Sequence, residues 1–306
     1  MAEKRKVLIT GATGYIASQM LDEYRERYDL TLVDVKNTDP KGNEVADVVI
    51  ADLSDLDRAS YQPLFDGVDA VVHLGYKRSS AGGVFGDAVA HIDRFDVELS
   101  NVQMANNVYR AAYDAGVRRM VVASSNHAAD WYEQALVHQR LKDVVSTTDL
   151  PVSDNFYGWA KAAYELLSWP YACGKFGRKL EFVHVRIGFT LEIDVEGLEG
   201  EGPGVPPAMT GMANFKRYLG AYLSPRDLRQ LVRKGIETPD INDRDGVPFV
   251  IVYGISGNTR AFWSLDTARN VLGYEPEDDS EVRFAKDVHR LLTGKGAGVA
   301  GGRVGV

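Results

Sequence analysis

Residues 7–17 read Val-Leu-Ile-Thr-Gly-Ala-Thr-Gly-Tyr-Ile-Ala, and this stretch decides the fold class. Four residues typical of a strand lead into Gly11 and Gly14, and a helical pattern follows. Glycine lets a backbone approach a pyrophosphate closely, and the first turn of a helix presents free N–H groups and a positive dipole end. Ala17 supplies the small side chain that close packing of helix on strand requires. The stretch therefore predicts a dinucleotide-binding turn.

A second strand pattern, residues 30–34, supports this prediction and indicates which dinucleotide binds. It ends in Asp34, twenty residues after Gly14. A carboxylate in that position accepts a hydrogen bond from a ribose 2′-hydroxyl and repels a 2′-phosphate. We therefore expect NAD rather than NADP as the cofactor.

Short apolar runs alternate with helical patterns along the chain. Strand patterns such as 70–74 and 119–123 are apolar on both faces, which is typical of a parallel sheet covered by helices on each side. We expect an α/β fold with a doubly wound (Rossmann) parallel sheet and a small C-terminal substrate lobe. The expected strands span 6–10, 30–34, 47–51, 69–74, 118–123, 180–187 and 248–253. The expected helices span 14–27, 55–65, 97–115, 154–176, 224–236 and 265–272.

The periodic patterns end after residue 188, and this suggests a division of the chain. We expect an NAD-binding domain with the catalytic residues over 1–190, a dependent substrate-binding lobe over 191–293 and a glycine-rich tail over 294–306. Residues 191–214 are rich in acids, glycines and prolines and have no period. Long aperiodic segments are often functional, and this one is expected to close over the substrate.

Composition excludes several classes of function. The 306 residues are 45% hydrophobic and 25% charged, with a net charge of −8 and no basic block, so we expect no nucleic-acid or membrane partner. No stretch of about 18 apolar residues exists to span a bilayer, and no secretory signal is visible. The single Cys173 excludes an internal disulfide framework and fits the cytoplasm. The histidines lack metal-ligand spacing, so no metal site is expected.

Three residues indicate catalysis of hydride transfer. Tyr157 and Lys161 are four residues apart in a helical pattern, so both lie on one helix face. A nearby cation favours phenolate and lowers a tyrosine pKa from about 10, which would make Tyr157 a general base toward an alcohol. Ser125 follows an apolar strand and therefore lies at the carboxyl edge of the sheet, where it can hydrogen-bond the reacting oxygen.

In combination these motifs resemble the extended short-chain dehydrogenase/reductase family over roughly residues 5–190. The resemblance implies that Asp52 and Leu53 hold the adenine and that Gly75 lies against the cofactor near its phosphates and ribose. It also implies that Lys161 holds the nicotinamide ribose. Asn101 falls at a further family position. The expected cofactor-binding residues are Gly11, Thr13, Gly14, Tyr15, Ile16, Asp34, Asp52, Leu53, Leu74, Gly75, Tyr157 and Lys161.

A narrower resemblance concerns the substrate. The segments 124–127, 185–188, 253–260 and 272–279 are similar to those of uronate dehydrogenases and related aldose 1-dehydrogenases. This similarity implies oxidation of the C1 hydroxyl of a cyclic aldose to the lactone, with a uronate or a 6-sulfo- or 6-phospho-sugar as the substrate. It implies that Arg217 grips a substrate carboxylate, a task suited to a bidentate guanidinium. The expected substrate-binding residues are Arg78, Ser125, Asn126, His127, Tyr157 and Arg217.

The chain departs from that pattern in the longer loop 128–156, at Phe189, and at Lys77 and Arg78. These departures leave the identity of the sugar open. Two other functions also stay open. One is a nucleotide-sugar epimerase or dehydratase that keeps NAD tightly bound, and the other is a non-catalytic NAD-binding regulator. The resemblance also implies a homodimer formed through the helices expected at 97–115 and 154–176.

Overall fold

The structure, a computed structural model, describes residues 4–78, 92, 94–193 and 212–293. Seven strands form one parallel sheet in the order β3-β2-β1-β4-β5-β6-β7. The order reverses next to β1, which makes the fold doubly wound and confirms the predicted class. The strands are β1 (Lys6–Thr10), β2 (Asp29–Asp34), β3 (Val48–Ile50), β4 (Ala70–His73), β5 (Arg119–Ser125), β6 (Glu181–Ile187) and β7 (Phe249–Gly254).

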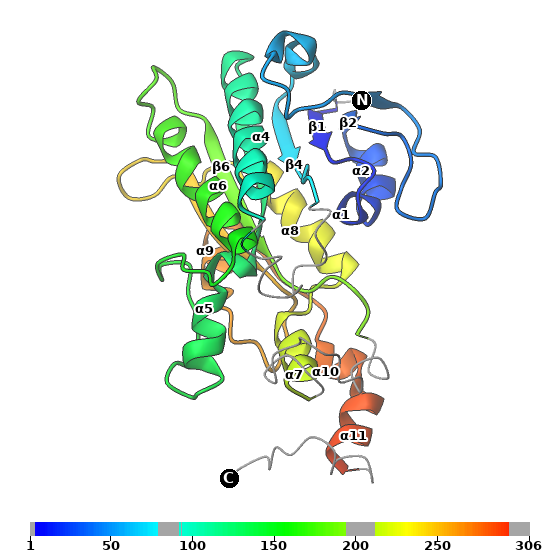
Figure 1. Ribbon diagram of the computed structural model, residues 1–306, viewed down its shortest axis with the longest axis vertical. Helices are drawn as coiled ribbons and strands as arrows, with labels where there is room; N and C mark the ends of the chain where they lie inside the picture. The colour runs from blue at the N-terminus through cyan, green and yellow to red at the C-terminus, as the bar shows by residue number, and fades with distance from the viewer. Residues whose placement is uncertain (1–3, 79–91, 93, 194–211, 294–306) are drawn as a thin grey trace.

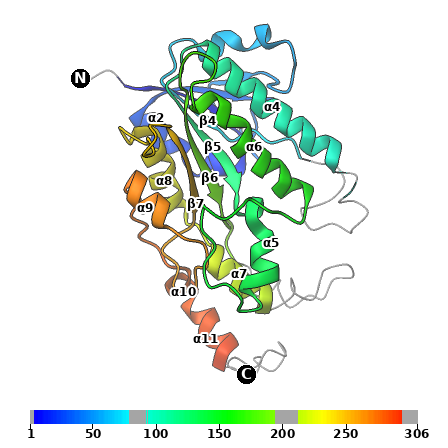
Figure 2. The same ribbon diagram turned by 90° about the vertical axis from the view of Figure 1, so that its left-hand side faces the viewer.

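Helices cover both faces of the sheet (Figures 1 and 2). Two long helices, α4 (Phe95–Asp114) and α6 (Phe156–Ala172), lie on one face, and Figure 2 shows α2, α8 and α9 on the other. The remaining described helices are α1 (Tyr15–Ser18), α2 (Leu21–Arg27), α5 (Asp130–Tyr132), α7 (Met212–Ala221), α8 (Pro225–Glu237), α9 (Asp266–Leu272), α10 (Ser280–Arg283) and α11 (Ala285–Thr293). Short 3₁₀ turns are η1 (Arg58–Ser60), η2 (Gln62–Phe65) and η3 (Asn126–Ala129), and η4 (Glu133–Val137) is a π turn.

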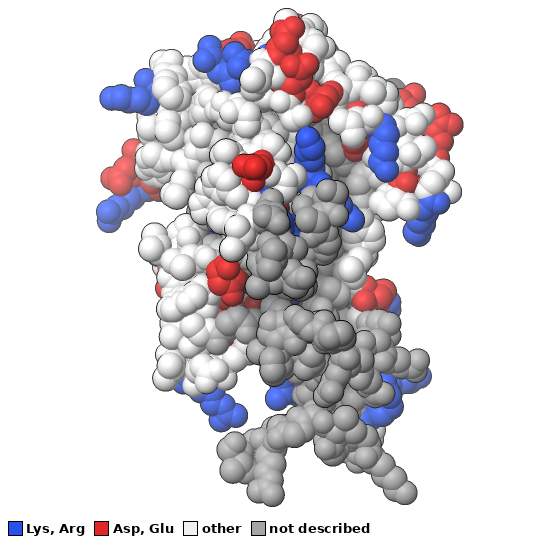
Figure 3. All heavy atoms as spheres, in the orientation of Figure 1, with Lys and Arg blue, Asp and Glu red and all other residues white. Residues whose placement is uncertain are grey.

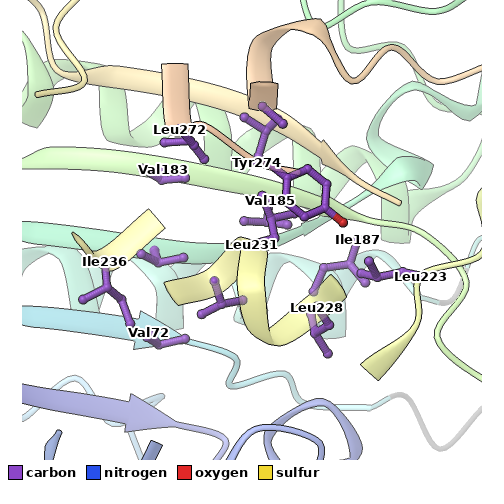
Figure 4. Close-up of a cluster of buried hydrophobic side chains, with 14 of the residues drawn as sticks. Val72, Val183, Val185, Ile187, Leu223, Leu228, Leu231, Ile236, Leu272 and Tyr274 are labelled. Atoms are coloured by element: carbon purple, nitrogen blue, oxygen red, sulfur yellow. The ribbon is translucent and has the colours of Figure 1, made fainter. Parts of the chain in front are cut away.

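The core consists of two main clusters, one on each face of the sheet. In the cluster shown in Figure 4, Leu228, Leu231 and Ile236 of α8 pack against Val72 and Val183 of the strands. Burial of each such side chain contributes roughly 1.5–3 kcal/mol. The second cluster joins the other face of the sheet to α4 and α6. Because every central strand is buried on both sides, the apolar runs in the sequence predicted the strands well.

Two predicted helices differ from those in the structure. The expected helix 14–27 is divided into α1 and α2, because the N–H of Met20 bonds to Ala17, three residues back, and interrupts the α-helical ladder. The expected helix 55–65 consists of the turns η1 and η2. The Asp57 carboxylate caps the first turn, and Pro63, which has no N–H, is the second residue of the second turn.

The segment after residue 190 contributes to two parts of the molecule. β7, α8 and α9 belong to the main sheet and its cover, whereas α7, α10 and α11 lie at one end of the sheet (Figure 2). The division at residue 190 stays a prediction. Most of the expected closing segment 191–214, together with the tail 294–306, lies outside the described residues. In the described ranges, no helix has the length and apolar character needed to cross a membrane.

Candidate active site

The glycine turn lies between β1 and α1, and a Cβ on either of its two glycines would meet backbone atoms. Gly11 has a φ of +66°, and a Cβ there would lie 2.8 Å from the backbone nitrogen of Gly75. A Cβ on Gly14 would lie 3.1 Å from the carbonyl oxygen of Gly11. Both glycines are therefore required by contacts inside the protein, and they hold the turn at the N-terminus of α1, where backbone N–H groups can bind a pyrophosphate.

Asp34, at the end of β2, is directly connected to this turn. Its Oδ2 accepts hydrogen bonds from the backbone nitrogen and the hydroxyl of Thr13, at 3.0 and 2.8 Å. Its Oδ1 accepts one from the backbone nitrogen of Val35 at 2.7 Å. The acid expected to bind a ribose therefore also braces the glycine turn, a role that the sequence did not reveal.

The other expected cofactor residues line the neighbouring strand ends. The Thr10 hydroxyl accepts hydrogen bonds from the backbone nitrogens of Leu74 and Gly75, each at 3.2 Å. Leu53 is buried, and the Ser54 hydroxyl, bonded to the neighbouring Asp52, lowers the pKa of that carboxyl group. Tyr15 and Ile16 belong to α1, where the Tyr15 hydroxyl donates to the carbonyl of Thr190 and Ile16 packs on the core.

Ser125, Tyr157 and Lys161 come together at the carboxyl end of β5. Ser125 is the last residue of that strand, and Tyr157 is the second residue of α6. The amine of Lys161 donates to the carbonyl of Ala123 at 2.9 Å and lies 5.8 Å from the centre of the Tyr157 ring. The Asn155 carboxamide caps α6 by accepting from the third following backbone nitrogen. The local sequence therefore starts the helix where its first turn can present Tyr157 to Ser125.

The electrostatics of this pair differ from the sequence prediction. Burial raises the pKa of the Tyr157 phenol, and the hydrogen bond with Ser125 only partly opposes this effect. Burial also lowers the pKa of Lys161 to about 8, with the charge of Glu98 opposing the shift. The expectation that Lys161 lowers the Tyr157 pKa below its ordinary value is wrong for this structure. The desolvation of the phenolate outweighs the charges around it.

A buried acid next to these residues was missed by the sequence analysis. Glu98 of α4 is fully buried and accepts a hydrogen bond from the Tyr76 hydroxyl at 2.6 Å. The Tyr76 ring meets the Tyr157 ring edge to face at 5.5 Å, and the Lys161 amine lies 5.2 Å from the Tyr76 ring centre. The signal that could have found Glu98 is a charged residue three positions before Asn101, on the same face of the predicted helix.

The expected substrate residues lie on several elements around Tyr157. The His127 ring meets the Tyr157 ring edge to face at 5.5 Å. Its Nδ1 lies 2.7 Å from the carboxylate of Asp130, and its Nε2 lies 3.5 Å from Arg217 of α7. Asn126 is buried beside Ser125 and accepts from its hydroxyl at 3.4 Å.

Arg78 is exposed on the segment after β4, and its charge favours ionisation of Tyr157. The Asn101 side chain bonds both backbone groups of the preceding Lys77, at 2.7 and 2.9 Å, and so positions this segment. The structure thus brings together residues that are far apart in the sequence.

Arg217 has a partner that the sequence analysis did not identify. Its Nε lies 2.8 Å from Oε1 of Glu133, which is fully buried at the start of η4. The side chain of His138 lies 3.2 Å from the same oxygen. Glu133 belongs to the loop 128–156, whose only distinctive feature in the sequence is its length.

The NAD dependent epimerase/dehydratase family matches residues 7–187, and the chain belongs to this family. NAD-dependent glucose-6-phosphate dehydrogenase of Haloferax volcanii is 32% identical over 286 residues, which cover 90% of this chain and 94% of the relative. Uronate dehydrogenase of Pseudomonas syringae is 28% identical and covers 92% of this chain and 85% of the relative. The crystal structure of uronate dehydrogenase from Agrobacterium tumefaciens has a TM-score of 0.67 and 27% identity, and covers 94% of this chain and 89% of that one.

These comparisons establish the class of the protein: it is an NAD-dependent oxidoreductase. The glycine turn fits the cofactor, because it lies at the N-terminus of α1 and Asp34 lies beside it, hydrogen-bonded to Thr13. In the described part of the chain, no cluster of three or more His, Cys, Asp or Glu side chains could hold a metal ion.

Figure 3 shows the distribution of charge on one face of the molecule. Acidic and basic side chains are interspersed on that face.

Proposed function

We propose that the protein oxidises the C1 hydroxyl of a cyclic aldose to the lactone, with an anionic hexose as the expected substrate. The observation that carries the proposal is the convergence of Ser125, Tyr157 and Lys161 beside His127 and Arg217. The names of the relatives support a sugar substrate, because those proteins are described as glucose-6-phosphate and uronate dehydrogenases.

The proposed chemistry assigns one task to each residue. The phenolate of Tyr157 takes the proton of the C1 hydroxyl, and the Ser125 hydroxyl orients the same oxygen. Bound NAD would accept the hydride from C1. The ammonium of Lys161 faces the Tyr157 ring and stabilises the phenolate when the substrate excludes water. Because burial raises the Tyr157 pKa, activity is expected to increase toward alkaline pH until Lys161 loses its proton.

The proposed cofactor contacts follow the strand ends. Gly11, Thr13 and Gly14 would hold the pyrophosphate, and Asp34 would accept from the adenosine ribose. The positions of Asp52, Leu53, Leu74 and Gly75 along neighbouring strand ends support contacts with adenine and the rest of the dinucleotide. Lys161 would also hold the nicotinamide ribose.

The test is production of NADH, followed at 340 nm, on a panel of aldoses. The panel contains glucuronate, galacturonate, glucose, glucose 6-phosphate and 6-sulfo-6-deoxyglucose, each with NAD and with NADP. Turnover of an aldose with NAD and release of the lactone would support the proposal. Binding of NAD without turnover of any aldose would contradict it and favour the nucleotide-sugar epimerase alternative.

We also propose that the protein forms a homodimer in the cytoplasm. Large apolar side chains are exposed on α4 and α6: Phe95, Leu99, Trp159 and Leu166. Pairing of these two helices with those of a second copy would remove this apolar surface from water. A monomer in analytical ultracentrifugation at micromolar concentration would contradict the proposal.

A further inference from the structure

A buried ion pair lies beside the residues expected to bind the substrate, and its meaning for substrate choice rests on the proposed aldose oxidation. Glu133 is a carboxylate with no exposed surface, and it lies in the long loop between β5 and α6. It begins the π turn η4, a rare backbone form that often occurs at functional sites. A buried carboxylate is costly unless a cation compensates it.

The compensating cation is Arg217, the residue expected to grip a substrate carboxylate. Its Nε lies 2.8 Å from Oε1 of Glu133, and its side chain is itself only 7% exposed. Its Nη2 lies 3.5 Å from Nε2 of His127, whose ring packs against Tyr157. The ion pair is therefore adjacent to the residues that handle the substrate.

A second carboxylate lies on the other side of His127. Oδ2 of Asp130 is 2.7 Å from Nδ1 of His127 and accepts from the Asn155 carboxamide at 2.9 Å. Leaving the histidines aside, the formal charges of Arg217, Glu133 and Asp130 sum to minus one. This group of side chains therefore offers hydrogen-bonding groups in which the charge of Arg217 is balanced by carboxylates.

We propose that Glu133 is a specificity-determining residue that cancels the charge of Arg217. The part of the substrate site beside Arg217 then accepts a hydroxyl-bearing, uncharged part of the aldose in preference to a carboxylate. A substrate carboxylate placed against Arg217 would also meet the like charge of Glu133, and such juxtaposition is strongly unfavourable in a buried site. A sugar hydroxyl can accept from the guanidinium without that repulsion. Under this proposal Arg217 orients the sugar rather than selecting a uronate, and the anionic group of the proposed hexose would bind away from Arg217, with the exposed Arg78 as the candidate cation.

The test compares kcat/KM for glucuronate with kcat/KM for glucose in wild type and in Glu133→Gln. Loss of the carboxylate leaves Arg217 positively charged, so the ratio of glucuronate to glucose should rise about tenfold or more. Asp143→Asn is the matched control, because Asp143 is an exposed acid of the same loop, and its ratio should stay at the wild-type value. An unchanged or lower ratio in a folded Glu133→Gln protein would overturn the proposal.

A double variant keeps the proposal testable if the buried Arg217 prevents Glu133→Gln from folding. Glu133→Gln with Arg217→Gln removes both charges, so its ratio should stay within about threefold of wild type. Arg217→Gln alone leaves the Glu133 carboxylate uncompensated and should lower the ratio. A double variant that discriminates against glucuronate as strongly as Arg217→Gln alone would overturn the proposal.

Calorimetric titration of the NAD-loaded protein separates this inference from the proposed function. A gain in glucuronate affinity in Glu133→Gln, without turnover of any aldose, would support the charge cancellation while refuting aldose oxidation. If the protein turns over aldoses but Glu133→Gln changes neither the glucuronate-to-glucose ratio of kcat/KM nor the affinity for glucuronate, the charge cancellation alone would be overturned. Absence of both turnover and sugar binding in every variant would overturn both.

Discussion

The buried ion pair between Glu165 and Arg186 gives the sharpest prediction about stability. Oε1 of Glu165 accepts from Nε of Arg186 at 2.9 Å, and Oε2 accepts from Nη2 at 2.7 Å. Neither side chain is exposed to solvent. The Ser124 hydroxyl also donates to Glu165 at 2.7 Å, and Arg186 donates to the Tyr253 hydroxyl at 2.8 Å. This one cluster therefore joins α6 to β5, β6 and β7.

Replacement of Glu165 by Gln keeps the volume of the side chain and removes its charge. Arg186 is then a buried guanidinium without a counter-charge, a change that costs about 3–5 kcal/mol. Domains unfold with a free energy of about 5–15 kcal/mol, so the loss is a large share of the total. Because Glu165 lies one helical turn after Lys161, and Ser124 directly precedes Ser125, activity should also fall before global unfolding.

Urea denaturation followed by circular dichroism measures this loss. The control is Asp114→Asn, which removes the carboxylate from the exposed Arg110–Asp114 pair of α4 and should cost about 0.3–0.5 kcal/mol. The double variant Glu165→Gln with Arg186→Met should recover most of the lost stability, because an apolar side chain needs no counter-charge. A Glu165→Gln variant that loses less than about 1 kcal/mol of unfolding free energy would refute the reasoning. Exposed ion pairs contribute no more than that, so burial would then add nothing to this pair.

Three further predictions concern the site. Tyr157→Phe should abolish NADH production yet keep NAD binding, which fluorescence quenching measures. Residual turnover above about one hundredth of the wild-type rate would argue against Tyr157 as the general base. Glu98→Gln removes a charge that raises the pKa of both Lys161 and Tyr157, so both pKa values should fall and the rise of kcat toward alkaline pH should move to lower pH. An unshifted pH profile would show that Glu98 acts on neither group. Asp34→Ala should raise the ratio of kcat/KM with NADP to kcat/KM with NAD about tenfold. It should also lower the melting temperature, because Asp34 braces the glycine turn. An unchanged ratio would show that Asp34 does not contact the ribose.

Local patterns predicted much of the fold because the relevant interactions are close in sequence. All seven strands were predicted to within two residues, since buried parallel strands read as apolar runs. The helix 14–27 was predicted as continuous because one i to i−3 bond at Met20 leaves no signal in the apolar period. The helix α7 was not predicted, because its residues follow an aperiodic, glycine-rich segment.

The sequence by itself determined the doubly wound sheet, the glycine turn with Asp34, and the placement of Tyr157 and Lys161 on one helix face, because short-range periodicity and turn chemistry encode these features. Only the tertiary structure decided the charges around them. Glu133 and Arg217 come from a long loop and a distant helix, and their pairing at 2.8 Å has no local signature. The raised pKa of Tyr157 is likewise a consequence of burial, which depends on every element that packs around the ring.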